Sequence, residues 1–89
     1  MKALASVTAG SLESSDVLIT VTPLEEERVE YVIESIVIQQ FGKRIRRVTE
    51  EMAQQAGLTG ARIHVQDRGA LECTLRARLE TAIERSAAR

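Results

Sequence analysis

The chain has 89 residues, a formal net charge of −1, and one tyrosine and one phenylalanine as its only large aromatic side chains. This length suits a single small domain, and the nearly neutral charge gives no electrostatic reason to bind nucleic acid or an anionic membrane. The scarcity of aromatic rings also disfavours binding by base stacking.

Few residues in the sequence could bind a metal ion or form part of a targeting signal. One cysteine and one histidine, Cys73 and His64, argue against a zinc site, so we expect no metal. The chain shows no signal-peptide pattern and no apolar run of ~18 residues, the length that a membrane-spanning helix needs. We therefore expect a cytoplasmic protein.

The first 15 residues are mostly small and polar, and they follow the period of neither a strand nor a helix. We expect residues 1–15 to form a flexible N-terminal arm and residues 16–89 to form one α+β domain. The stretch Ala9–Asp16 (AGSLESSD) holds three serines in eight residues, which predicts an exposed loop that presents a hydroxyl. Composition alone favours a simpler interpretation, a polar linker in which Asp16 caps the strand that follows.

Two stretches then alternate between apolar and polar positions as strands do. The first covers residues 16–22 and ends at Pro23, which cannot donate to a ladder of strand hydrogen bonds. The second covers residues 28–35. Because the link between them is short, we expect an antiparallel hairpin.

From Ile38 the apolar period changes to that of a helix, which we expect to end near Gly57, a suitable residue just beyond a helix C-terminus. Its apolar face comprises Ile38, Phe41, Ile45, Val48, Met52 and Ala56. Residues 61–66 alternate again and predict a third strand.

The last segment fits two structures. Residues 71–79 alternate as a strand would, but the same leucines also form a helical stripe that continues to Ser86. No helix breaker follows Gly69, so we expect a helix from about Leu71. The alternative is a second hairpin between the third strand and residues 70–79.

The expected fold is therefore α+β, with the element order β-β-α-β-α and two helices packed on one face of a small mixed sheet. The sheet has three strands, or four if residues 70–79 pair. The strands at 28–35 and 61–66 should be parallel, with a right-handed crossover through the first helix. The expected core packs Phe41, Ile45, Val48, Leu75 and Leu79 against Val17, Ile19, Ile33 and Val65.

Candidate catalytic residues are weak. Cys73 is expected to pack as a small apolar residue, and His64 to be exposed on the polar face of the third strand. The basic cluster Lys43, Arg44, Arg46 and Arg47 could bind a phosphate or an acidic partner, but a helix surface balanced by Glu50 and Glu51 is favoured. We see no catalytic residues that would make the chain an enzyme by itself.

Three motifs, taken together, resemble the family of citrate lyase acyl carrier proteins, the gamma subunits. They are the stretch Ala9–Asp16; Gln40-Phe41-Gly42 with Ile45; and Asp67–Cys73 followed by residues 76–80. They lie in the family's order. Arg68 and Glu72 stand where many relatives carry lysine and aspartate, and both differences keep the charge.

The resemblance implies that the chain is a modified protein. In the family, the serine that matches Ser14 carries 2'-(5''-phosphoribosyl)-3'-dephospho-CoA (phosphoribosyl-dephospho-coenzyme A) through a phosphodiester. Glu13 and Asp16 would be recognised by the modifying transferase. Contacts with the phosphates or with a partner subunit are expected from Arg68, Arg76 and Arg78, although a solvated helix face explains the arginines of the helix equally well.

The implied function is that of a non-catalytic carrier. Its acetyl and citryl thioesters would pass between an acyl-transferase (alpha) subunit and a lyase (beta) subunit, which cleave citrate to oxaloacetate and acetate. Alternatives are a carrier for citramalate lyase or malonate decarboxylase, and a ferredoxin-like module that binds a small ligand without a prosthetic group. A nucleic-acid binder that uses the basic cluster is a third class, against which the missing aromatics argue.

Overall fold

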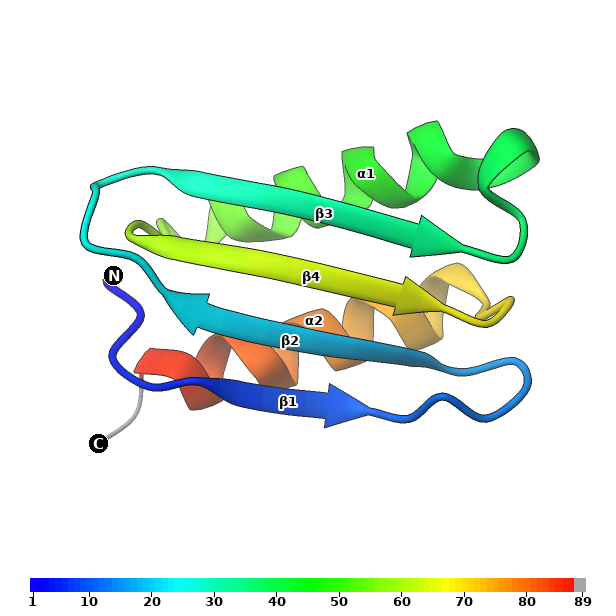
Figure 1. The fold of residues 1–89 in the computed structure, drawn as a ribbon, viewed down its shortest axis with the longest axis horizontal. Coiled ribbons are helices and arrows are strands. Elements are labelled where there is room, and N and C mark those ends of the chain that lie inside the picture. The colour runs from blue at the N-terminus through cyan, green and yellow to red at the C-terminus, as the bar shows by residue number, and fades with distance from the viewer. Residues whose placement is uncertain (88–89) are drawn as a thin grey trace.

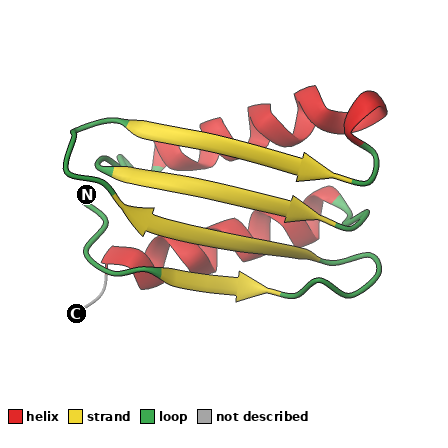
Figure 2. Cartoon of the chain, viewed as in Figure 1, coloured by secondary structure: helices red, strands yellow, loops and turns green. Residues whose placement is uncertain are grey.

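The computed structural model describes residues 1–87, which form a four-stranded sheet and two helices (Figure 1). In chain order the elements are β1 (Val7–Gly10), β2 (Val17–Pro23), β3 (Val29–Ser35), α1 (Ile38–Gln55), β4 (Ala61–Asp67) and α2 (Glu72–Ala87). Both helices cover the same face of the sheet and leave the other face open (Figure 2). The predicted α+β fold with two helices on one face is confirmed, and the predicted order β-β-α-β-α describes β2 to α2.

The strands lie in the order β1-β2-β4-β3. The predicted parallel pairing of β3 with β4, connected through α1, is confirmed. The predicted hairpin between β2 and β3 is wrong, because β4 lies between them and pairs antiparallel with β2. Charge favours this order: Arg62 of β4 donates to Glu30 of β3 at 2.9 Å, and an edge position suits a strand that carries glutamates.

The fourth strand was not predicted from the sequence. Residues 7–10, expected within a flexible N-terminal arm, form β1 and pair antiparallel with β2, with Val7 opposite Val21 and Gly10 opposite Leu18. The expectation of an arm without regular structure therefore does not hold for these residues. Residues 70–79 do not supply the fourth strand, because α2 begins at Glu72 as the favoured alternative predicted.

The core lies between the sheet and the helices. Its fully or almost fully buried side chains include Val17, Ile19, Val21, Ile45, Val48, Ile63, Val65, Leu75 and Leu79. One predicted member is wrong: the Phe41 side chain is 38% exposed. The first turn of α1 extends beyond the end of β3 (Figure 1), and Phe41 lines an open cavity there rather than the closed core.

The helix ends follow local sequence. Gly57 has a φ of +66°, and its N–H donates to the carbonyl of Gln54 at 3.0 Å, so the predicted glycine at the end of α1 is confirmed. The start of α1 is less regular, since Val37 provides no side-chain cap.

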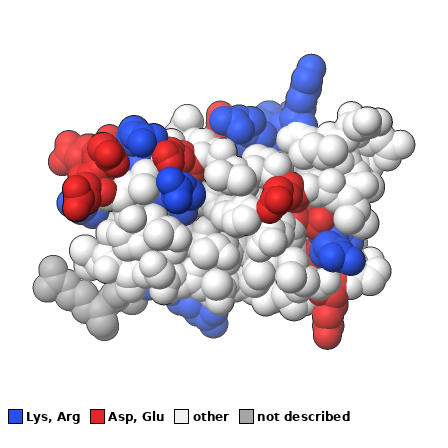
Figure 3. Space-filling view, in the orientation of Figure 1, with Lys and Arg blue, Asp and Glu red and all other residues white. Residues whose placement is uncertain are grey.

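Figure 3 shows the open face of the sheet, where uncharged atoms cover much of the middle and most charged side chains gather toward the ends. Within residues 1–87, no helix is long and apolar enough to cross a membrane.

Candidate functional site

The serine-rich loop joins β1 to β2 as a hairpin connection, at the end of the sheet opposite the N-terminus (Figure 1). The β3–α1 and β4–α2 connections lie at the same end. Glu13, Ser14 and Ser15 are exposed, and Ser15 adopts a left-handed backbone with a φ of +64°. The predicted exposed loop thus exists, with Ser14 in its outer turn.

Asp16 closes the base of this loop. Its carboxylate accepts a hydrogen bond from the Ser11 hydroxyl at 2.7 Å and another from the N–H of Val17 at 2.7 Å. The Ser11 hydroxyl oxygen in turn accepts from the N–H of Glu13 at 3.2 Å. Asp16 therefore does cap the strand entry, as the simpler interpretation held, and it also fixes the loop that carries Ser14.

Arg78 of α2 holds the same carboxylate from the other side. Its Nε lies 3.2 Å from Oδ1 of Asp16 and its second nitrogen 3.3 Å from Oδ2, a two-bond contact between residues 62 positions apart. The hydrogen bond from Ser11 and those from Arg78 hold the pKa of Asp16 at about 2, below its ordinary value. Arg78 thus positions the loop, a contact that sequence reasoning did not anticipate.

Arg68, of the β4–α2 connection, lies beside the loop through its backbone. Its carbonyl accepts from the N–H of Ser15 at 2.9 Å, and its own N–H donates to the carbonyl of Asp16 at 2.9 Å. The side chain is exposed, and within residues 1–87 no carboxylate lies within 4.0 Å of it. Of the three arginines predicted to contact phosphate, this one combines proximity to the Ser14 loop with an unengaged guanidinium.

Arg76 is engaged elsewhere. Its Nε donates to Glu72 at 3.1 Å and another nitrogen donates to Glu51 of α1 at 3.5 Å, so its side chain links the two helices. The structure does not bring Arg76 to the Ser14 loop.

Replacing Asp16 by asparagine is expected to lower the melting temperature at pH 7, and to lower it progressively less as the pH falls toward 2. A folded-state pKa below the unfolded value, ~3.9, means that the ionised carboxylate stabilises the fold above pH ~4. This contribution is lost as the pH falls through the folded-state pKa of about 2, so the difference between wild type and Asp16→Asn should shrink steadily from pH 4 to pH 2. Thermal unfolding followed by circular dichroism from pH 2 to 7 checks this, and a constant difference across that range would contradict it.

The remaining candidates lie apart from the loop. Cys73 was expected to pack as an apolar residue, but it is exposed on the first turn of α2, where no core element covers it. His64 lies on the open face of the sheet, half-buried and paired with Glu34, rather than simply exposed as expected. Within residues 1–87, no three His, Cys, Asp or Glu side chains gather as a metal site would require.

The basic cluster is divided by the structure. Arg46 pairs with Glu50 at 2.8 Å and Arg47 with Glu51 at 3.8 Å, as the favoured solvated helix surface predicts. Arg44 instead lies over the ring of Phe41, with its guanidinium carbon 4.6 Å from the ring centroid.

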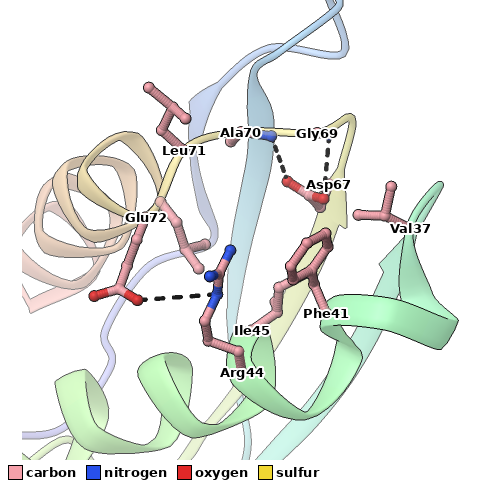
Figure 4. Close-up of a pocket in the computed structure, with 10 residues that line it drawn as sticks. Val37, Phe41, Arg44, Ile45, Asp67, Gly69, Ala70, Leu71 and Glu72 are labelled. Carbon is pink, nitrogen blue, oxygen red and sulfur yellow. Dashed lines mark hydrogen bonds and ion pairs between the residues drawn. The ribbon is translucent and has the colours of Figure 1, made fainter.

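A cavity of about 340 Å³, lined mostly by apolar side chains, opens between the first turns of α1 and α2 (Figure 4). Phe41, Ile45 and Leu75 form part of its wall, and Arg44 and Glu72 approach each other across it. Sequence reasoning missed this cavity because it assigned Phe41 to the core. One feature of the sequence could have pointed to the cavity: the motifs Gln40-Phe41-Gly42 and Asp67–Cys73 lie at the starts of the two helices that form it.

Fold and loop together define a class, a small α+β domain that displays a serine hydroxyl on a hairpin loop held from three sides. Comparison with known proteins identifies the family to which this domain belongs. The acyl carrier protein family model described as "Malonate decarboxylase delta subunit (MdcD)" matches residues 5–86. The chain belongs to this family of acyl carrier proteins.

Curated relatives cover nearly the whole chain. The citrate lyase acyl carrier protein of Streptococcus mutans is 46% identical over 79 residues, 89% of this chain and 78% of that protein. That of Escherichia fergusonii is 42% identical over 87 residues, 98% of this chain and 90% of that protein. Citrate lyase acyl carrier protein 2 of Salmonella paratyphi A is 45% identical over 87 residues, 98% of this chain and 90% of that protein.

Proposed function

We propose that this chain is the acyl carrier subunit of a citrate lyase and that Ser14 carries its prosthetic group, phosphoribosyl-dephospho-coenzyme A. The observation that carries the proposal is the exposure of Ser14 on a loop fixed by Asp16, Arg78 and the backbone of Arg68. The names of the curated relatives supply the substrate. The partners would be the acyl-transferase and lyase subunits and the enzyme that attaches the group, all in the cytoplasm.

The residues present fit a phosphodiester at Ser14. The serine oxygen would attack the donor's phosphorus, lose its proton and displace the donor's leaving group. Asp16 is a poor base for this proton, because its pKa of about 2 keeps it ionised and weakly basic. The base must therefore come from the attaching enzyme, while this chain supplies an accessible hydroxyl on a defined loop.

Once attached, the group supplies a terminal thiol that holds the acyl group as a thioester. The protein supplies position. The contacts that anchor the loop hold it against both β2 and α2, so that the arm would start from a fixed point on the protein surface. Tethering raises the effective concentration of the acyl group at each partner active site.

The direct test is intact mass. The chain, expressed together with its attaching enzymes, should gain the mass of one phosphoribosyl-dephospho-coenzyme A, and fragmentation should place the gain at Ser14. An unmodified chain isolated from a functional lyase complex would contradict the proposal.

A second candidate is the carrier of a malonate decarboxylase, which the description of the matching family model favours. Activity assays on the chain that carries the prosthetic group distinguish the two candidate functions. A citrate lyase carrier should support release of oxaloacetate from citrate by the cognate subunits, whereas a malonate decarboxylase carrier should support release of CO₂ from malonate.

Arg68→Glu is expected to lower kcat/KM for attachment of the group about 5-fold or more, corresponding to ~1 kcal/mol for an exposed contact with phosphate. Because the side chain is exposed and unpaired within the described residues, the melting temperature should stay within about 2 °C of wild type. Arg68→Lys keeps the charge and should retain most of the activity. If Arg68→Glu and wild type were modified at equal rates, Arg68 would have no role in attachment of the group.

A further inference from the structure

The cavity between α1 and α2 lies at the same end of the molecule as the Ser14 loop, and a second hollow lies beside the loop. This hollow, of about 280 Å³, is lined by two apolar residues, Leu12 of the loop and Ile36, and by the polar residues Glu34, Ser35, Gln66, Asp67 and Arg68. Asp67 lines both the hollow and the cavity, and Ile36 precedes Val37, which lines the cavity. A chain attached at Ser14 could therefore follow a continuous surface from the loop to the cavity.

Exposed apolar side chains lie along that surface among polar ones. Ile36 is 66% exposed and Leu12 47% exposed along the hollow, and Leu71 at the cavity is 71% exposed. These side chains would lose unfavourable contact with water if a partly apolar ligand covered them. The cavity itself is concave and falls within the range of ~300–1,000 Å³ typical of small-molecule sites.

Three charged groups line the cavity, and one of them, Arg44, is placed to bind a carboxylate. Asp67 is fully engaged, accepting from the Ser35 hydroxyl at 2.7 Å and from the N–H groups of Gly69 and Ala70 at 3.1 and 3.0 Å. Glu72 accepts from Arg76 at 3.1 Å and lies 4.0 Å from Arg44. Within residues 1–87, Arg44 therefore has only this long contact with a carboxylate, and its guanidinium faces the cavity beside Phe41 (Figure 4).

We propose that this cavity is the resting site of the thiol end of the prosthetic arm and of its acyl group. The inference rests on the proposed function. Charged, polar and apolar groups follow the order of the arm's parts: Arg68 near Ser14 for the phosphates, the mixed polar and apolar hollow and then the cavity for the pantetheine chain with its amides, and Arg44 for a carboxylate of the acyl group. A docked thioester is shielded from water and from stray nucleophiles until a partner subunit withdraws it.

The test measures how accessible the arm's thiol is. Cys73 is exposed and would react itself, so the protein carries Cys73→Ser, and intact mass confirms that the arm is attached. A maleimide should alkylate the attached thiol about 10-fold more slowly than the thiol of free coenzyme A, as expected if the cavity is occupied about nine-tenths of the time. The same protein in denaturant should react at the free rate.

Phe41→Ala should raise the alkylation rate at least 3-fold, because it removes a wall of the cavity. The matched control is Val32→Ala, which truncates another partly exposed apolar side chain, 41% exposed, on the open face of the sheet, and should leave the rate unchanged. Arg44→Gln, at a side chain 45% exposed, is a second variant that should fold, and it should raise the rate at which added hydroxylamine cleaves the thioester of an arm that carries a carboxylated acyl group.

Amide chemical shifts locate the arm independently. Attachment should shift the amides of Phe41, Gly69 and Leu71 as well as those of the loop. Shifts confined to residues 11–16, or a thiol that reacts at the free rate, would overturn the inference. So would cavity shifts that appear only after a lyase or transferase subunit is added, since the cavity would then be a docking surface.

The two proposals fail separately. Alkylation is measured on protein whose mass already shows the arm, so an accessible thiol removes the resting site and leaves the carrier function standing. A chain that gains no mass with its attaching enzymes removes both.

Discussion

Ser14→Ala is expected to abolish both the mass gain and all citrate cleavage by the reassembled lyase, a loss limited only by the detection of the assay. The hydroxyl is the sole proposed anchor of the thiol, and no other group on this chain can replace a missing covalent bond. The fold should not change, because Ser14 is exposed and none of its side-chain atoms takes part in a recorded hydrogen bond within residues 1–87. Intact mass and oxaloacetate release are the two measurements.

The neighbouring serines provide the controls. Ser15 is also exposed, and alanine at its φ of +64° is as strained as serine, so Ser15→Ala should keep the mass gain. Ser11 is unsuitable as a control, since its hydroxyl bonds to Asp16. Modification that persists in Ser14→Ala and disappears in Ser15→Ala would move the attachment site by one residue.

Gly10→Ala is expected to destabilise the protein by about 3 kcal/mol or more, lowering the melting temperature by more than about 10 °C. Gly10 ends β1 with a φ of +91°, which L side chains rarely adopt. A Cβ built there would also lie 1.8 Å from the carbonyl oxygen of Val17, so the backbone at the base of the Ser14 loop must move. Thermal unfolding by circular dichroism measures the loss.

Gly57→Ala is the matched control, because it separates backbone strain from steric overlap. Gly57 has a φ of +66°, but a Cβ there would meet its nearest atom only at 4.0 Å. This substitution should cost about 1 kcal/mol, the ordinary penalty for alanine in the left-handed region. Equal losses for the two variants would show that the overlap at Gly10 is relieved without cost.

Together these variants separate what the loop displays from what holds it. In the proposed function Ser14 would supply the attachment point, and its side chain makes no hydrogen bond within residues 1–87, whereas Gly10 and Asp16 contribute the hairpin geometry that keeps Ser14 exposed. We expect Gly10→Ala and Asp16→Asn to slow attachment of the prosthetic group in proportion to the disorder they introduce in the loop.

The sequence by itself determined the elements whose signals are local. Periods of two and of 3.6 residues located β2, β3, β4 and α1, because those periods arise from the geometry of a single strand or helix. The segment that forms α2 fitted both periods, and the absence of a helix breaker after Gly69 favoured the helix. Gly57 marked the end of α1 for the same reason, since the left-handed backbone there depends on neighbours in the chain. The candidate Ser14 was also found from the sequence, by its resemblance to a family motif.

Only the tertiary structure decided which elements meet. β1 has just four residues with no long apolar pattern, and it is a strand because β2 offers it an unpaired edge. The position of β4 between β2 and β3, the exposure of Phe41 and the contact of Arg78 with Asp16 likewise depend on residues far apart in the chain. Pairing and burial are properties of the whole packed molecule, so no local pattern in this chain could specify them.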